Sequence, residues 1–337
     1  MIRKRMSGYV VIAAMTMPIA VHAQPSAVSD SGTMTVPFVF DGKRPPVWSG
    51  GALLVADGLL FSPSAFMAFN RDGRPISSAG FSIPEAFKTS IDGFARGADG
   101  TVALCGQSYA SDGRGAPFIA LISADGDPQR VIRTEPYMPA VVAVAPDGTL
   151  WTVGHELNFD SHSEKGVNRE AGVLRHYDRN GKSLGAFIPR SSIKDISHFT
   201  LPFSMLAATA DRVGWLHYDV RGRAPGAYIE ISRDGNVSSY PLPQPQGAQP
   251  YFLDLGGMAI TDAGDVFAVV NNFTNKQPSS FTLVVLNRSE GLWLPVRMPV
   301  SASSARLYGS NGNELAFWLA TGGGGYSTVH FFTPDKR

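Results

Sequence analysis

The sequence predicts an all-β fold, a six-bladed β-propeller whose final blade is completed by a strand near the N-terminus. Short apolar runs joined by Asp-Gly or Asn-Gly recur along the chain, as in "AVAPDGTLWTVG" (143–154), and a second hairpin signal follows each of them. Residues that mark these second turns are 53, 55, 54 and 56 positions apart, at Asp72, Asp125, Asn180, Asp234 and Glu290. Two hairpins in each period make a four-stranded unit, and six such units protect their edges by closing radially.

The first residues have the features of a secretory signal peptide. Arg3, Lys4 and Arg5 precede a short apolar run, and a small-x-small pattern ends at Ala23. This pattern predicts a signal at 1–23 and a single propeller domain at 24–337, in the periplasm or outside the cell. An uncleaved membrane anchor is the alternative. After cleavage no segment is apolar over the roughly 20 residues of a membrane helix, so we expect no transmembrane anchor.

The turn signals divide the remaining chain into strands and blades. Asp-Gly and Asn-Gly most readily supply the positive φ that a two-residue hairpin requires. The apolar segment "TMTVPFVF" (33–40) stands alone before the first repeat, and the last repeat has room for only three strands. We therefore expect this segment to complete the last blade. The predicted blades are 51–81, 91–133, 140–190, 204–241, 255–299 and 304–337.

Composition narrows the class of partner. Removing the signal takes three cations from the total of 29, leaving 26 against 28 acidic residues, a formal charge of −2. This balance predicts neither a nucleic-acid partner nor an anionic membrane partner. Cys105 is the single cysteine, so the chain forms no internal disulfide and its stability must come from burial.

Candidate site residues follow the ends of the second strands of the blades. In a propeller the loops opposite the Asp-Gly turns surround the mouth of the central channel, where ligands bind. The polar residues expected at this mouth are His155, Glu156, His217, Asp219, Asn271 and Asn272. Such a ring would suit a sugar or another hydroxylated ligand. The alternative is that polar residues end strands because water hydrates them.

The loop after the second strand of blade three adds a candidate metal site. Asp160 and His162 lie close to His155 and Glu156 in the sequence, and two imidazoles beside two carboxylates could hold a transition metal. A solvated loop is the alternative.

Two repeats resemble a known group of propellers. The segments "SIDGFARGADGTVALCG" (90–106) and "MPAVVAVAPDGTLWTVG" (138–154) are similar to repeats of the NHL and gluconolactonase-like six-bladed propellers. Those enzymes hold a divalent cation at the channel mouth, and the resemblance places Asp92 at the position of their metal-binding aspartate. Their glutamate at the start of the first blade has no counterpart in "VWSGGALLV" (47–55).

Two functional hypotheses result. The first is a secreted or periplasmic binding or interaction module, with a small molecule or an envelope protein at the channel mouth. The alternative is a metal-dependent small-molecule hydrolase, resembling the lactonases, or a lyase. It would be built around Asp92 and His155 with a divalent cation. The sequence contains no G-x-S-x-G nucleophile motif.

Overall fold

The computed structural model describes residues 26–36, 46–57, 65–84, 86–157, 168–193, 205–217, 226–243, 256–274, 277–320 and 327–335. The predicted signal peptide at 1–23 and three predicted site residues, Asp160, His162 and Asp219, lie outside these ranges. None of the helices in the described ranges is long and apolar enough to cross a membrane.

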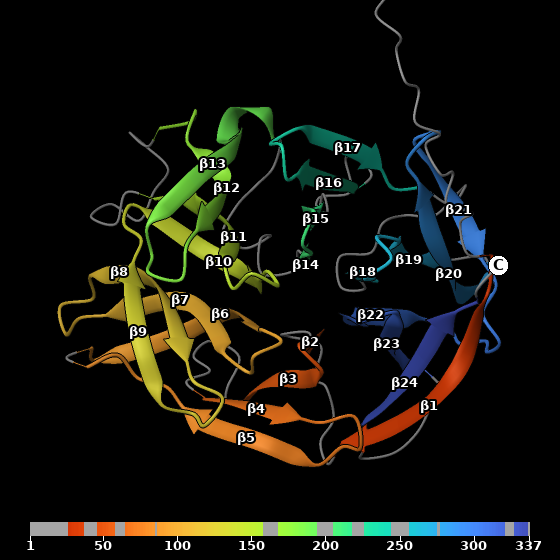
Figure 1. The fold of residues 1–337 in the computed structure, drawn as a ribbon, viewed down its shortest axis with the longest axis horizontal. Helices are drawn as coiled ribbons and strands as arrows, with labels where there is room; N and C mark the ends of the chain where they lie inside the picture. Colours follow the sequence, from red (N-terminus) through yellow and green to blue (C-terminus); the bar gives the residue numbers. More distant parts are fainter. Residues whose placement is uncertain are drawn as a thin grey trace, which may run out of the picture.

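The protein is all-β, and its sheets stand around a common centre in the manner of a β-propeller (Figure 1). Four sheets have four antiparallel strands each, ordered from the centre outward as in the sequence. These are β6 (Lys88–Arg96), β7 (Val102–Tyr109), β8 (Gly115–Ile122) and β9 (Pro128–Arg133); β10 (Tyr137–Val144), β11 (Leu150–Glu156), β12 (Gly172–Tyr177) and β13 (Ser183–Pro189); β14 (Met205–Ala208), β15 (Arg212–His217), β16 (Ala227–Ser232) and β17 (Val237–Pro241); and β18 (Met258–Ile260), β19 (Val266–Thr274), β20 (Gln277–Asn287) and β21 (Leu292–Val296). A short 3-10 helix at Arg190–Ser192 follows β13.

The remaining strands form one eight-stranded sheet in the order β1-β24-β23-β22-β2-β3-β4-β5. Its two halves meet at a single parallel pair, Trp48 with Gly309. The strands are β1 (Val28–Val36), β2 (Val47–Ser49), β3 (Ala52–Asp57), β4 (Ala65–Phe69), β5 (Pro75–Gly80), β22 (Ala305–Asn311), β23 (Glu314–Leu319) and β24 (Ser327–Pro334).

The N-terminal strand pairs with the last strand of the chain, as expected, but at different residues. β1 runs antiparallel to β24 from the pair Val28–Pro334 to the pair Val36–Ser327. The expected strand at 33–40 is therefore displaced toward the N-terminus, and residues 37–40 lie outside the described part of the chain. Residues 29–33 are not apolar, so the apolar pattern of the sequence does not indicate that the strand begins at Val28.

The Asp-Gly turns form, but not as the two-residue turns that the sequence predicted. In the turn at 145–149, the amide of Gly148 donates to the carbonyl of Ala145, and the amide of Ala145 donates to the carbonyl of Thr149. Gly148 has a φ of +79°, whereas Asp147 is not in the left-handed region. This is a type I turn followed by a left-handed glycine. The Asp147 carboxylate accepts the Thr149 amide at 2.9 Å, which explains its place before the glycine.

Bulges in the innermost strands explain why several repeats end in glycine. In β10, Ala140 is an extra residue between the pairs Pro139–Gly154 and Val141–Val153. The bulged strand crosses so close to β11 that a Cβ atom at Gly154 would overlap the carbonyl oxygen of Met138. Gly106 of β7 has the same close approach to β6. The repeated glycine is thus a packing requirement of the bulge.

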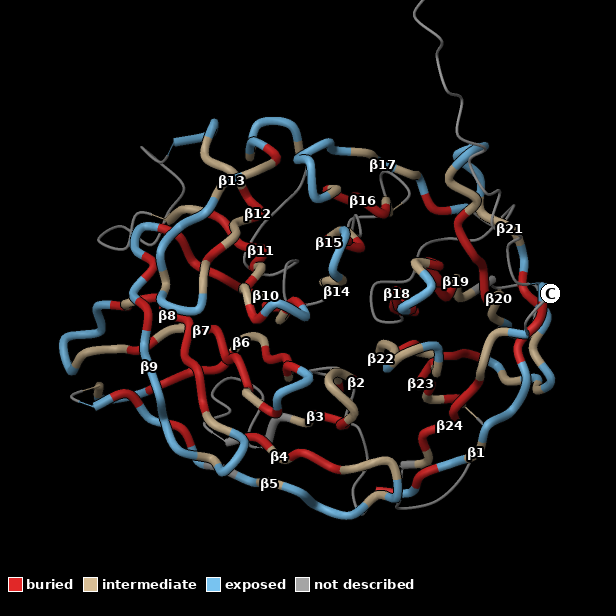
Figure 2. Tube along the Cα trace, in the orientation of Figure 1, coloured by how far each residue is buried: buried red, intermediate tan, exposed pale blue. Residues whose placement is uncertain are grey.

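The hydrophobic core lies between neighbouring sheets. Trp215 of β15 is fully buried and belongs to one cluster with Val153 of β11, and Phe317 of β23 is buried in one cluster with Phe267 of β19. Figure 2 shows this pattern: the middle strands are buried, whereas the outermost strands, such as β5, β9 and β13, are largely exposed.

Arginines in the outer turns join groups of strands. Three of these turns carry an arginine whose guanidinium reaches an acid outside its own hairpin; two of the pairs join adjacent sheets, and Arg71 joins the two halves of the eight-stranded sheet. The pairs are Arg71 with Glu314 at 3.0 Å, Arg179 with Asp99 at 3.4 Å and Arg288 with Glu230 at 3.0 Å. The most buried of these acids is Glu230, so its contact with Arg288 should contribute most to holding two sheets together.

Candidate functional site

A cavity of about 560 Å³ lies at the centre of the ring, between the innermost strands. Every innermost strand contributes to its wall, namely β2, β6, β10, β14, β18 and β22. The wall extends to the hairpin turns that follow these strands, including Pro146, Ala210 and Asp262. The sequence had predicted a site at the opposite, loop end of the channel, where much of the chain lies outside the described residues.

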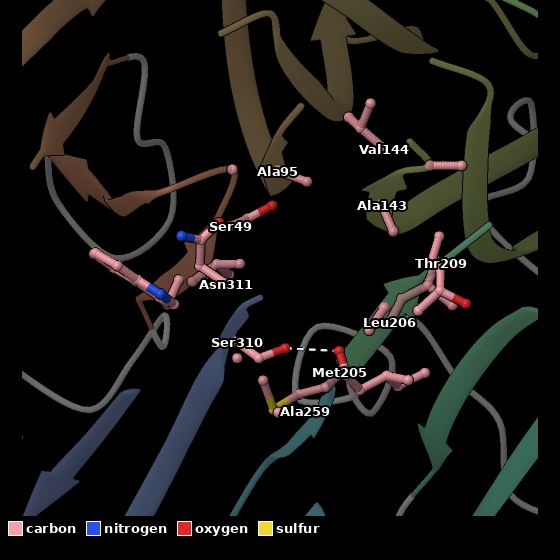
Figure 3. A pocket seen from close by; sticks show the side chains of 18 of the residues that line it. Ser49, Ala95, Ala143, Val144, Met205, Leu206, Thr209, Ala259, Ser310 and Asn311 are labelled. Carbon is pink, nitrogen blue, oxygen red and sulfur yellow. Dashed lines mark hydrogen bonds between the residues drawn. The ribbon is translucent and has the colours of Figure 1, made fainter. Parts of the chain in front are cut away.

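One side of the cavity is apolar. β14 contributes Met205, Leu206, Ala207 and Ala208, and all four are partly exposed. Ala143 and Val144 of β10 adjoin them in the wall. Figure 3 shows Met205, Leu206, Ala143 and Val144 around the same hollow.

Hydroxyl groups on the wall are bonded to the backbone of the protein itself. Ser310 donates to the carbonyl of Ile260 at 2.7 Å, a contact drawn in Figure 3. Ser49 donates to the carbonyl of Arg96 at 2.7 Å, and Thr209 donates to the carbonyl of Arg212 at 3.3 Å. Because each hydroxyl has a single proton, these three side chains have no proton left for a ligand in this arrangement.

The two arginines of the wall are also engaged. Arg96 donates to the carbonyl of Gly50. Arg212 approaches the Glu230 carboxylate at 3.4 Å. Both guanidiniums therefore serve first to hold neighbouring strands or sheets together.

Asp92 is the predicted site residue that the structure places in the cavity wall. It is the extra residue of a bulge in β6, between the pairs Ile91–Gly106 and Gly93–Cys105. A bulge turns a side chain away from the regular alternation of the strand. Burial, with a smaller contribution from the Asp92 charge, raises the pKa of Tyr109 at the end of β7, so the phenol stays protonated at neutral pH.

His155 and Glu156 lie at the end of β11 and do not line the cavity. His155 is 2% exposed. The Glu156 carboxylate accepts a hydrogen bond from Arg175 at 2.7 Å, and the Arg175 guanidinium lies 4.0 Å from the centre of the Tyr137 ring. Successive side chains of a strand point to opposite faces, so these two residues face different neighbouring sheets.

Asn271 connects two sheets. Its side-chain amide donates to the carbonyl of Ala305 and its oxygen accepts the amide of Ala305, both at 3.0 Å. Gln107, at the end of β7, also contacts a neighbouring sheet, because its side-chain amide lies against the sulfur of Met138 at the start of β10. His217 ends β15 with its ring centre 4.9 Å from that of Trp215. Of Asn272 the structure describes the backbone position in β19.

The described residues do not supply the donor set of a metal centre. No group of three or more His, Cys, Asp or Glu side chains within the described ranges is placed to share an ion. The bulge that holds Asp92 recurs in β10 and β22, where the equivalent residues are Ala140 and Tyr308. The repeat therefore provides one carboxylate at these three positions, which is insufficient for a hard divalent cation.

Comparisons with known proteins give a likeness of fold. No protein-family model matches the sequence, and no curated protein sequence matches it. Among solved structures, an oxidoreductase (glucose dehydrogenase) from Thermus thermophilus, an assignment that is itself provisional, is 15% identical, with a TM-score of 0.48 over 90% of this chain and 99% of that one. A gluconolactonase from Xanthomonas campestris is 15% identical, with a TM-score of 0.47 over 92% and 98%. A neuraminidase-like protein of A/flat-faced bat/Peru/033/2010 is 12% identical, with a TM-score of 0.48 over 92% and 97%. Such a likeness does not fix an activity.

Proposed function

We propose that this protein binds a small molecule in the cavity at the centre of a six-bladed propeller. The observation that carries the proposal is the cavity itself. Its volume of about 560 Å³ is typical of small-molecule sites, and every innermost strand contributes to its wall. The predicted signal peptide would place this binding in the periplasm or outside the cell.

The proposed blade count treats the eight-stranded sheet as two blades. Its halves share one residue pair, Trp48 with Gly309, whereas β1 pairs with β24 over eight residue pairs. In this proposal β1 is the fourth strand of the last blade and closes the ring between the two ends of the chain. Arg71 supports the closure, because its guanidinium contacts Glu314 and the carbonyl of Ser31 in β1.

A second candidate function is metal-dependent hydrolysis of a lactone or a related small molecule in the same cavity. The observation that favours it is the position of Asp92 in the cavity wall, since the sequence resemblance assigns a metal to this residue. This function requires further oxygen or imidazole ligands within about 2.0–2.6 Å of the same ion.

Thermal denaturation tests both functions on the purified protein. A ligand that binds the folded state alone raises the melting temperature. We would measure it with a panel of lactones, sugars, carboxylates and apolar amphiphiles, and separately with Ca²⁺, Mg²⁺, Mn²⁺ and Zn²⁺. The variant Ala207→Trp fills the cavity from β14, and Val237→Trp places the same side chain on the exposed outer strand of the same sheet.

We expect at least one class of compound to stabilise the wild type and the Val237→Trp variant but not the Ala207→Trp variant. A metal-specific rise that is lost in Asp92→Asn, accompanied by lactone hydrolysis, would instead establish the second candidate. If no compound and no metal shifts the melting temperature, the cavity is not a ligand site and both proposals are wrong.

A further inference from the structure

The strand β14 differs from the other innermost strands in its exposure. All four of its residues are apolar and all four are partly exposed, whereas the three residues of β18 are buried and most of β10 is buried. Since these four residues line the central cavity, apolar surface faces the hollow at the middle of the protein. Apolar surface in a concave site favours a ligand that removes it from water.

The polar groups of the wall favour the same class of ligand. A sugar needs several donors and acceptors, and a polar group that is buried without a partner costs about 1–3 kcal/mol. The protons of Ser49, Thr209 and Ser310 are already bonded to backbone carbonyls. These three hydroxyls can accept a hydrogen bond from a ligand, but they cannot donate one without breaking a bond to the protein.

Backbone groups remain available for a single polar group. β10 and β14 are terminal strands of their sheets, so one edge of each has no strand partner. By contrast, β22 is bridged to β2 at Trp48–Gly309, and Leu307 of β22 pairs with Gly257 just before β18. In the part of the chain that the structure describes, no such bridge joins β14 to another sheet. The N–H and C=O groups on this side that have no strand partner among the described residues could bond a polar head.

We infer that the cavity binds an amphipathic small molecule, with its apolar body against β14 and its polar group on the free strand edges. This inference rests on the proposed function and names the class of ligand. It replaces the hydroxylated ligand that the sequence suggested. The wall favours this class because the partly exposed apolar side chains of β14 form one side of it, while its acidic and amide side chains lie elsewhere along the wall, at Asp92, Asp211, Asp262 and Asn311.

Fluorescence of N-phenyl-1-naphthylamine, which increases in an apolar site, provides the test. The probe would be titrated into the purified protein and displaced with decanoate, glucose or gluconolactone. The variant Leu206→Gln keeps the size of the side chain but makes the wall polar, and Val237→Gln is the matched control on the outer strand of the same sheet. Circular dichroism would establish that each variant is folded.

We expect saturable binding of the probe, displacement by decanoate and no displacement by glucose or gluconolactone. Leu206→Gln should weaken binding about tenfold, which corresponds to about 1.4 kcal/mol, and Val237→Gln should leave it unchanged. If gluconolactone or glucose binds and decanoate does not, the inference is wrong although the proposed binding function stands. If neither class binds and no other compound shifts the melting temperature, the proposed function fails as well.

Discussion

Replacing Glu230 should destabilise the protein more than any other single change to an acidic residue that we can identify. Its carboxylate lies between two sheets, with a side chain that is 9% exposed. It accepts hydrogen bonds from the Tyr228 hydroxyl and from Arg288 Nε, both at 3.0 Å, and Arg212 approaches it at 3.4 Å. Glu230→Ala removes the one acceptor that these three groups share.

The size of the effect follows from what the substitution leaves behind. Breaking a buried ion pair costs about 3–5 kcal/mol because an uncompensated charge remains. Arg212 and Arg288 retain 26% and 25% exposure, so water can partly hydrate them. We therefore expect the lower part of that range, about 3 kcal/mol. For a protein of 337 residues it corresponds to a fall in melting temperature of about 4 °C.

Urea denaturation of the wild type, Glu230→Ala, Arg288→Met and the double variant measures this effect. The two single effects should exceed that of the double variant by about 2 kcal/mol, because the second substitution removes a charge that the first left unpaired. Glu170→Ala, at an exposed position, is the control and should change stability by less than about 0.5 kcal/mol. Strict additivity, or a loss below 1 kcal/mol in Glu230→Ala, would show that the network does not join the sheets.

Three further predictions concern other features of the fold. Gly154→Ala should lower the free energy of unfolding, measured with urea, by several kcal/mol, because the new Cβ would overlap the backbone of β10. Gly113 is left-handed but lies in open space, so Gly113→Ala should cost only roughly 1–2 kcal/mol. Equal losses would contradict the bulge argument. Arg71→Ala should cost about 1 kcal/mol, since its pair with Glu314 is partly exposed, and should speed hydrogen exchange in β1 specifically. Burial lowers the pKa of His176, with Asp147 partly offsetting it, so the unfolded state binds this proton more readily. Stability should therefore be complete above about pH 7 and fall as the pH drops below about 6.5. His176→Phe should flatten that part of the urea midpoint profile, and an unchanged slope would refute the assignment.

The sequence repeat predicted most of the fold because the residues that repeat, the turn residues and glycines, are those that the backbone conformation requires. The even spacing of the second turns gives the four-stranded units. The glycines of the inner turns are left-handed in the structure, as at Gly100, Gly148 and Gly264, and the turn between β14 and β15 is formed without one. The turn type was wrong because an Asp-Gly pair is compatible with both a two-residue turn and a type I turn with a following glycine. The residue before the pair can decide between them, since Pro146 occupies the second position of the turn at 145–148, where a type I turn favours proline.

One signal in the sequence was overlooked. Four of the outer turns have an arginine at the second position, at Arg71, Arg179, Arg233 and Arg288. Three of these side chains reach an acid in another unit, namely Glu314, Asp99 and Glu230. A charged residue that repeats with the fold period indicates a contact between repeats, because each repeat meets the same surface of its neighbour.

The candidate site was harder to predict because polar residues at strand ends have two possible roles. Asn271 was a candidate for ligand binding, and its amide instead makes two hydrogen bonds to the backbone of Ala305. Glu156 was a candidate as well, and it pairs with Arg175. Sequence reveals that such a side chain is polar but not which way it points.

These contacts at the outer turns also bear on the shape of the central cavity. Two innermost strands can close a channel by pairing edge to edge, as β22 does with β2. An outer ion pair can accompany such pairing, since Arg71 with Glu314 spans the same junction, whereas Arg288 holds the sheets that contain β14 and β18 with no strand pairing between these two among the described residues. Their edges and their apolar side chains then remain open to the hollow. Contacts at the rim would in this way determine the width of the site, and a substitution such as Glu230→Ala should alter ligand affinity as well as stability.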